Sequence, residues 1–240
     1  MKIALIGTGK MGQAIETLAV SRGHEIVLKL NHENIDSFTN EDLKVADVAI
    51  EFTRPDAATG NLKRCLDASI PVVCGTTGWY DELNQITDLF TSNNGALVYA
   101  SNFSVGVNMM FELNRILAKW MQSHNEYRVS LSEIHHTHKL DKPSGTAVTL
   151  ANGIIENNTT YSKWTLEENQ ANAIYIDAQR EPDVVGTHDV KWESEIDIIQ
   201  LHHHAKSRDG FALGAIHAAE WIIGKKGVFT MKDILFGNTN

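Results

Sequence analysis

The chain has 240 residues, of which 42% are hydrophobic, so it can bury a sizeable core as one large domain or two small ones. Its formal net charge of −9 argues against a general nucleic-acid-binding protein, because such proteins present a basic face. No apolar run approaches the length of a membrane span, and the run at 3–6 is too short for a signal peptide. We therefore expect a cytoplasmic protein that binds neither nucleic acid nor membranes. The two cysteines, Cys65 and Cys74, are expected to be small core residues.

The N-terminus carries a glycine motif in the setting where such motifs bind phosphate groups. Residues 2–6 form an apolar run suited to a buried parallel strand, and residues 12–22 have helical periodicity. Gly7 permits a tight turn, Gly9 lets the backbone approach a pyrophosphate, and Gly12 lets the helix pack on the strand. A glycine-rich turn without a ligand is the alternative. The predicted dinucleotide site consists of Gly7, Thr8, Gly9, Lys10, Met11 and Gly12.

The end of the next predicted strand, at 25–30, bears on the choice of cofactor. The motif usually places an acidic residue there to hold the ribose hydroxyls, but this chain has Asn31. Asparagine can hydrogen-bond a ribose hydroxyl, and it does not repel a 2′-phosphate as a carboxylate would. Lys10 and Lys29 could favour that phosphate. The choice between NADH and NADPH therefore stays open.

Strand and helix patterns alternate along the first hundred residues, which predicts βαβ units and a parallel sheet. Ligands on such sheets bind at the carboxyl ends of strands. Two of these ends, 75–78 and 101–104, are small and polar, so the backbone can approach a flat ring closely. Phe103 either packs on a nicotinamide or belongs to the core. The further expected strands lie at 47–52, 71–74 and 96–100, and the further expected helices at 56–67 and 80–91.

The pattern changes after an amphipathic helix expected at 106–123. Strand-rich sequence follows, which predicts a second domain on an antiparallel or mixed sheet, with the boundary near Ser104. We expect a dinucleotide-binding domain at 1–104, with 212–240 packing back on it, and a second domain at 105–211. The other expected elements are strands at 127–134, 173–177, 187–192 and 196–202, helices at 145–157 and 212–224, a polar loop at 157–170, and a strand or turn at 227–231.

The segment 133–147 is the most informative about chemistry. Ser144 is a good helix N-cap, and the amides of Gly145 and Thr146 would point outward without partners inside the helix. A helix N-terminus beside cationic side chains can bind a carboxylate or phosphate, and titratable donors next to it suggest proton transfer to a bound acid. A polar rim of the sheet is the alternative. The titratable side chains are His135, His136, His138 and Lys139.

These segments resemble the 4-hydroxy-tetrahydrodipicolinate reductase family, long called dihydrodipicolinate reductase, of bacterial lysine and diaminopimelate synthesis. The most specific element is Glu133-x-His135-His136-x-x-Lys139-x-Asp141-x-Pro143-Ser144-Gly145-Thr146-Ala147. Further blocks that agree in family order lie at 10–12, 47–53, 75–78, 102–108 and 203–215. The resemblance therefore covers nearly the whole chain.

The resemblance implies a reductase that uses NADPH or NADH to convert 4-hydroxy-tetrahydrodipicolinate to tetrahydrodipicolinate. His135 would donate or relay a proton, and Lys139 would act as general acid or electrostatic partner. The family fold is an α/β Rossmann-type domain joined to an α+β substrate-binding domain, whose mixed open sheet builds a homotetramer. The implied binding residues are His136, Ser144, Gly145 and Thr146 for the dicarboxylate substrate, and 7–12, Asn31, Gly75, Thr76, Thr77, Ala100, Ser101, Asn102 and Phe103 for the cofactor.

The chain departs from the family pattern at a few positions. The family usually has an acid at Asn31, alanine at Lys142 and aspartate at Glu51. It also has an Arg-Gly-Gly segment where this chain reads Arg180-Glu181-Pro182, in a shortened region. These departures leave cofactor preference and local loop geometry open, but not the class of reaction.

Three other functions compete with this interpretation. A metal enzyme could use the histidines at 135–138 and 202–204, but their spacing fits no common zinc motif and neighbouring strand residues point to opposite faces, so we expect no metal. A non-catalytic dinucleotide sensor would bind cofactor without turnover and leave the basic cluster at 135–142 unused. A related reductase would act on another small dicarboxylate.

Overall fold

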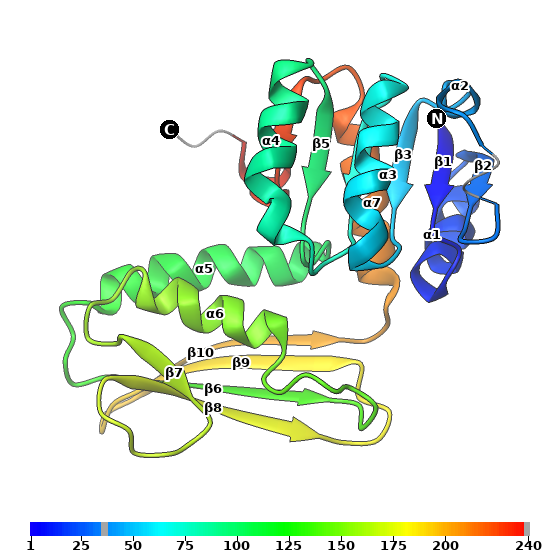
Figure 1. Cartoon of the computed structure of the whole chain (residues 1–240). Helices are drawn as coiled ribbons and strands as arrows, with labels where there is room; N and C mark the ends of the chain where they lie inside the picture. The colour runs from blue at the N-terminus through cyan, green and yellow to red at the C-terminus, as the bar shows by residue number, and fades with distance from the viewer. Residues whose placement is uncertain (35–37, 238–240) are drawn as a thin grey trace. The chain divides into compact units, whose positions relative to one another are not determined.

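The computed structural model describes residues 1–34 and 38–237, which form two compact units (Figure 1). Unit 1 comprises residues 1–105 together with the segment from 209 onward, and unit 2 comprises residues 106–208. Each unit has its own sheet and its own buried core. The two units are therefore described separately.

Unit 1 is built on a sheet of parallel strands in the order β11-β5-β4-β3-β1-β2, with helices on both faces (Figure 1). Its strands are β1 (Lys2–Ile6), β2 (Glu25–Leu30), β3 (Val48–Glu51), β4 (Val72–Cys74), β5 (Ala96–Tyr99) and β11 (Gly227–Phe229). Its helices are α1 (Lys10–Ser21), α2 (Asn40–Leu43), α3 (Pro55–Asp67), α4 (Leu83–Ser92) after the 3-10 turn η2 (Tyr80–Glu82), α7 (Asp209–Ile222) and α8 (Met231–Phe236). This is the predicted Rossmann-type arrangement.

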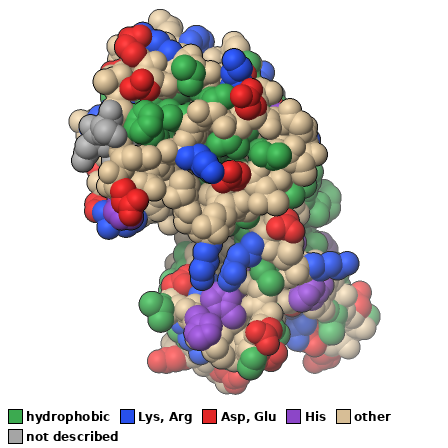
Figure 2. All heavy atoms as spheres, turned by 90° about the vertical axis from the view of Figure 1, so that its right-hand side faces the viewer, with side chains coloured by type: hydrophobic (Ala, Val, Ile, Leu, Met, Phe, Trp, Pro, Cys, Tyr) green, Lys and Arg blue, Asp and Glu red, His purple; other side chains and the backbone are tan. Residues whose placement is uncertain are grey.

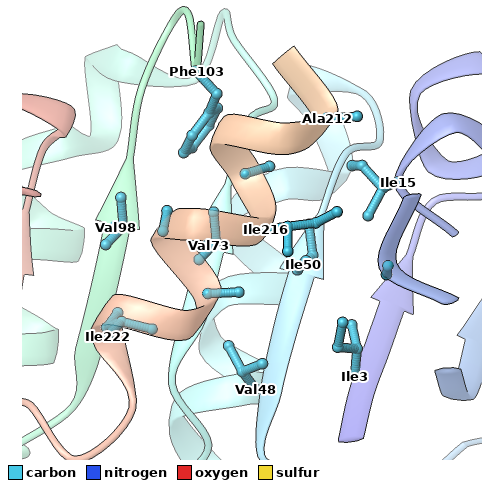
Figure 3. Packing of buried hydrophobic residues seen from close by; sticks show 14 of the residues in the cluster. Ile3, Ile15, Val48, Ile50, Val73, Val98, Phe103, Ala212, Ile216 and Ile222 are labelled. Carbon is cyan, nitrogen blue, oxygen red and sulfur yellow. The ribbon is translucent and has the colours of Figure 1, made fainter. Parts of the chain in front are cut away.

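The central strands of unit 1 are mostly apolar because both of their faces are covered. Side chains alternate between the two faces of a strand, so Ile3 faces α1 and α7 whereas Ala4 faces α3 and α4. Figure 3 shows Ala212, Ile216 and Ile222 of α7 packed over the strands. Helix α7, which comes from the C-terminal part of the chain, thus completes the core of the Rossmann-type unit.

Close backbone contacts fix the start of the glycine motif. Gly7 has a φ of +101°, a conformation that L side chains rarely adopt. A Cβ on Gly12 would lie 2.1 Å from the carbonyl oxygen of Gly7, so α1 can pack this closely only without a side chain there. The roles predicted for these two glycines, the tight turn and the close packing, are confirmed.

Unit 2 is built on a mixed sheet in the order β10-β9-β6-β8-β7. Strand β6 pairs parallel to β8 and antiparallel to β9, as the predicted mixed sheet requires. Its helices α5 and α6 lie on one face, where they bury one set of alternating strand residues (Figure 1). The bounds are α5 (Val105–Met121), β6 (Arg128–His135), α6 (Gly145–Ile155), β7 (Lys163–Thr165), β8 (Ala173–Arg180), β9 (Gly186–Glu193) and β10 (Ile198–Ala205).

Short elements account for the main errors in the predicted structure. The expected loop at 157–170 contains β7, which has three residues and carries no periodic signal of its own. Helix α8 begins at Met231, where the expected strand or turn ends, and the short helix α2 lies at 40–43, where the sequence analysis places no element. Both of these helices begin with a capping box, a local signal that the sequence does contain.

The contact at Gly12 predicts a large stability difference between two Gly→Ala substitutions. Gly12→Ala should lower the free energy of unfolding by ~1–3 kcal/mol, because the new methyl group meets rigid backbone. Gly60→Ala is the control, since a Cβ there meets nothing within 4 Å in an exposed turn of α3, and it should stabilise by ~0.5–1 kcal/mol. Urea unfolding followed by circular dichroism measures both; equal midpoints would contradict the packing argument.

Candidate active site

A cavity of about 360 Å³ lies at the carboxyl ends of the strands in unit 1. The start of α1 forms one side, and the segments after β3 and β4 form the others. The lining residues are Gly9, Lys10, Met11, Phe52, Thr53, Pro55, Gly75, Thr76 and Thr77. Several of the predicted phosphate-binding residues therefore meet Gly75, Thr76 and Thr77 in one cavity, as expected for a parallel sheet.

The backbone at this cavity suits a pyrophosphate. Gly9 is the N-cap of α1 and makes no side-chain cap bond, and a Cβ on Gly9 would meet nothing within 4 Å. The first amides of a helix carry a partial positive charge and lack intrahelical partners, so an anion can approach them here without steric hindrance. At Gly75, by contrast, a Cβ would lie 2.1 Å from the Phe52 ring, so this loop also depends on glycine.

A buried carboxylate, Glu51, holds the two strand ends that line the cavity. Its side chain is fully buried and accepts hydrogen bonds from Asn61 Nδ2 at 3.2 Å, from the Cys74 thiol at 3.1 Å and from the Thr53 hydroxyl. The Thr53 amide in turn donates to Thr76 Oγ1 at 2.7 Å. Sequence reasoning noted Glu51 only as a departure from the family and missed this role.

The other predicted cofactor residues take different positions. Phe103 is 2% exposed and its ring packs 5.8 Å from Phe52, so its side chain belongs to the core rather than to an open ring-binding surface. The side-chain carbonyl group of Asn102 accepts a bond from the Ser104 amide at 2.8 Å, which fixes the turn after β5. The side-chain carbonyl group of Asn31 accepts a bond from the Glu33 amide at 2.8 Å, so this side chain can offer a ribose its N–H donors.

The second cluster of polar residues lies in unit 2, on the helix-covered face of the sheet. Glu133 and His135 are two residues apart on β6, so both side chains point to this face. Glu133 is opposite His188 of β9 in the strand register, and His135 is opposite Arg180 of β8. His135 Nδ1 lies 3.4 Å and His188 Nε2 3.6 Å from Glu133 Oε2.

The N-terminus of α6 adjoins this cluster. Ser144 caps the helix as predicted, since its hydroxyl accepts a bond from the Ala147 amide at 3.1 Å. Its own amide donates to Glu133 Oε1 at 3.0 Å, and its hydroxyl lies 3.3 Å from His188 Nε2. A Cβ on Gly145 would meet nothing within 4 Å, so the first turn of the helix is open to an anion.

Arg180 holds the loop that carries Lys139. Its guanidinium donates to the carbonyl oxygens of Lys139 at 3.3 Å and Asp141 at 2.5 Å, and to Glu133 Oε1 at 3.3 Å. The Lys139 ammonium donates to the Asp141 carboxylate at 2.8 Å, and its side chain is 23% exposed. The ammonium is thus fixed at the surface of the cluster, where a ligand can reach it.

The surroundings set the protonation states of the central pair. Burial alone would raise the pKa of Glu133, but the nearby His188 and the hydrogen bond from Ser144 outweigh it and lower this pKa to about 2. Burial and the neighbouring His188 lower the pKa of His135 to about 4, against the opposite effect of the Glu133 charge. At neutral pH the ligand-free site therefore holds a carboxylate beside a neutral imidazole.

Comparison with known proteins identifies the family of the chain. A model of the N-terminal part of dihydrodipicolinate reductase matches residues 1–103, and a model of the C-terminal part matches residues 106–235. The chain belongs to the dihydrodipicolinate reductase family. A 4-hydroxy-tetrahydrodipicolinate reductase from Christiangramia forsetii is 50% identical over 98% of each chain, and one from Ralstonia nicotianae is 33% identical over 98% of this chain and 99% of its own.

A solved structure has the same fold. The dipicolinate-bound dihydrodipicolinate reductase from Paenisporosarcina sp. TG-14 aligns with a TM-score of 0.82 over 98% of this chain and 99% of its own, at 24% identity. The predicted α/β fold with its second, mixed-sheet domain is thereby confirmed. Among the helices that the structure describes, none has the length and apolar character needed to cross a membrane.

A basic surface borders the cluster in this member of the dihydrodipicolinate reductase family. Burial lowers the pKa of His136, and the positive charges nearby act in the same direction. Figure 2 shows histidine side chains beside lysine and arginine side chains on one face of the molecule. The charged groups that act on His136 are Arg208, His138, Lys139 and Arg180.

Sequence reasoning missed two members of the cluster, Glu133 and His188, as functional candidates. The alternation of β6 could have found Glu133, because it shares a face with His135. His188 lies far along the chain, and only the strand register brings it to Glu133. The roles predicted for His135, His136, Lys139, Gly145 and Thr146 stay predictions.

The lowered pKa of His135 predicts acid sensitivity. Its folded pKa of about 4 lies below the ordinary 6.5, so between these values the unfolded chain binds a proton that the folded chain does not, and acid favours unfolding. His135→Gln should remove this contribution, which is at most about 3 kcal/mol. We expect the melting temperature of the wild type to fall more than that of the variant between about pH 7 and about pH 4. Equal falls would contradict the assignment.

Proposed function

We propose that the protein is an NAD(P)H-dependent reductase that converts 4-hydroxy-tetrahydrodipicolinate to tetrahydrodipicolinate in lysine and diaminopimelate synthesis. The observation that carries the proposal is the 50% identity to a 4-hydroxy-tetrahydrodipicolinate reductase over 98% of both chains. In the net conversion a hydride and a proton enter the substrate and water leaves. The chain must therefore bind a hydride donor, hold a cyclic dicarboxylate and deliver a proton.

The cavity of unit 1 is the proposed cofactor site. The open Gly9 backbone and the uncapped amides of α1 support pyrophosphate binding there. When bound, the reduced nicotinamide supplies the hydride. Asn31 presents N–H donors, which suit both a ribose hydroxyl and a 2′-phosphate, and Lys10 lines the cavity. Lys29 pairs with Glu16 at 2.8 Å, so Lys10 is the better candidate for contact with a phosphate. We therefore propose that NADH and NADPH are both used.

The N-terminus of α6 and the basic surface beside it form the proposed substrate site. The amides of Gly145 and Thr146 lie in the first turn of α6, where the helix dipole favours a carboxylate. His136 and Lys139 add positive or donor groups around it. The dipicolinate bound in the Paenisporosarcina protein is a cyclic dicarboxylate of the same class, which supports this assignment.

His135 and Lys139 are the proposed source of the proton. His135 is neutral in the ligand-free site, but a dianionic substrate nearby would raise its pKa, because an opposite charge favours the charged imidazole. Binding therefore prepares His135 to take a proton and pass it to the substrate. Lys139, held by Asp141 and by Arg180 through its backbone, is placed to supply that proton or to neutralise charge that develops on the substrate.

We also propose the wider organisation of the enzyme. Residues 1–104 with 212–240 form the dinucleotide-binding domain and residues 105–211 form the substrate and oligomerisation domain, which the observed units at 1–105 with 209–240 and at 106–208 support. The helices of unit 2 lie on one face of its sheet, which leaves the other face for contact between subunits of a homotetramer (Figure 1). A cytoplasmic location agrees with the free thiols of Cys65 and Cys74.

An assay coupled to a dihydrodipicolinate synthase tests the proposed function. The wild type should consume NADH and NADPH only when the synthase supplies the substrate, and His135→Gln should lower kcat by roughly 10²–10⁴-fold with little change in cofactor affinity. Loss of nicotinamide absorbance follows the reaction. Cofactor binding without turnover would support a dinucleotide sensor, turnover of another dicarboxylate alone would support a related reductase, and a fully active His135 variant would refute its role.

Two substitutions at Gly145 test the anion site on α6. Gly145→Pro removes one N–H donor but suits the first helical position, and Ser144, with φ −70° and ψ 157°, has the backbone that a residue before proline prefers. Gly145→Ala keeps the donor and is the matched control. We expect KM for the substrate to rise about 10–100-fold in the proline variant alone, because a charge-assisted hydrogen bond contributes ~1.5–3 kcal/mol. Equal KM values in both variants would contradict the site.

A further inference from the structure

One fully buried carboxylate, Glu133, lies against Ser144, Arg180, His135 and His188 in unit 2. Glu133 Oε1 accepts from the Ser144 amide at 3.0 Å and from the Arg180 guanidinium at 3.3 Å. Glu133 Oε2 faces His135 Nδ1 at 3.4 Å and His188 Nε2 at 3.6 Å. Ser144 begins α6, and Arg180 holds the loop of Lys139, so the proposed anion site and both proposed proton donors are linked to this group.

The packing of β6 does not require a charge at this position. Val129 and Leu131 occupy the preceding inward positions of the strand and belong to the apolar core of unit 2. A buried carboxylate costs several kcal/mol unless hydrogen bonds and opposite charges compensate it, and an apolar residue would pack as well. The groups that do compensate it are those of the proposed active site, which points to a role in function rather than in folding.

We propose that Glu133 is the positioning residue of the proton-donating site, which fixes the tautomer of His135 and ties the Lys139 loop and the α6 N-terminus to that imidazole. The proposal rests on the proposed function. Glu133 is ionised at neutral pH and can only accept, so the nitrogen that faces it, Nδ1, carries the proton. The other nitrogen, Nε2, is then free to accept a proton and pass it on.

The space around His135 agrees with this orientation. A Cβ on Gly186 would lie 3.1 Å from His135 Nε2, so glycine at this position leaves room beside the nitrogen that is proposed to exchange protons. The charged and titratable groups that act on His135 come from each neighbouring strand and from the loop. They are Glu133 on β6, Arg180 on β8, His188 on β9 and Lys139.

A metal site is the competing explanation for the same geometry. Ligand atoms of Glu133, His135 and His188 lie within 4.8 Å of one another. However, Arg180 places a fixed cation 3.3 Å from Glu133, which opposes the binding of a second cation. The hydrogen-bond partners of the carboxylate therefore favour a positioning role.

Glu133→Gln gives a specific test, because it reverses the polarity of one half of the side chain. The carbonyl oxygen of the new amide must accept from the Ser144 amide and Arg180, so its NH₂ group faces His135 Nδ1. The imidazole must then accept at Nδ1 and carry its proton on Nε2. Nitrogen-15 NMR of labelled histidine distinguishes the two tautomers, and a residue that only stabilised the fold would leave them unchanged.

We expect Glu133→Gln to lower kcat by about 10–100-fold, with KM for NADH unchanged and the tautomer of His135 reversed. The alkaline limb of the kcat–pH profile should move to lower pH, because the Glu133 charge acts to raise the pKa of His135 and the variant lacks it. Glu156→Gln, which neutralises a carboxylate at the other end of α6, is the control and should leave all four readouts unchanged.

Glu133→Asp keeps the charge and serves as the second variant. It should retain the Nδ1-protonated tautomer and recover part of kcat, even if Glu133→Gln folds poorly. Wild-type kcat and an unchanged tautomer in Glu133→Gln, or the reversed tautomer in Glu133→Asp, would overturn the proposal. Added Zn²⁺ that bound the wild type at this site and shifted the ¹⁵N resonances of both His135 and His188 would overturn it too, in favour of the metal explanation. The NMR readout needs no substrate, so it separates failure of this proposal from failure of the proposed function.

Discussion

The polar end of unit 2 is organised by the burial of one negative charge. A carboxylate that water cannot reach must find its donors in the protein, and Glu133 finds them in Arg180 on β8 and in the amide of Ser144 at the start of α6, with His188 of β9 at 3.6 Å. Each of these donors is then fixed in turn. The same requirement accounts for the orientation of Arg180, the position at which α6 begins and the placement of His135. The chemistry of the site therefore depends on the same contacts that pack this end of the sheet.

Unit 1 also buries a carboxyl group, but its hydrogen-bond partners are of a different kind. Glu51 is also fully buried at a strand end, but its hydrogen bonds come from neutral groups, Asn61, Cys74 and Thr53. None of these donors is a cation, whereas the Arg180 guanidinium lies 3.3 Å from Glu133. The proposed anion site of unit 1 accordingly relies on the backbone amides at the start of α1 together with Lys10, and that of unit 2 relies partly on charged side chains.

Much of the fold follows from sequence, because long apolar runs and helical periodicity are local properties. The strands at 2–6 and 25–30 have the predicted bounds, and residues of the glycine motif line the cavity proposed for the cofactor. The contacts that could not be predicted from the sequence depend on the register between strands that are distant along the chain. His188 meets Glu133 only because β9 pairs antiparallel to β6, and no local pattern encodes that alignment. Likewise Phe103 could be placed in the core only once the position of α7 was known, since a Cβ on Gly214 would lie 1.8 Å from the Phe103 carbonyl oxygen.

The hydrogen bond between Cys74 and Glu51 also affects how the thiols of this chain react. Burial and the nearby carboxylate raise the pKa of Cys74, and burial raises that of Cys65, so neither forms the thiolate that alkylating agents and oxidants attack. Both thiols become reactive only when the sheet of unit 1 opens. The rate at which these two thiols are labelled therefore measures how often the Rossmann-type sheet of unit 1 opens, and it needs no introduced probe.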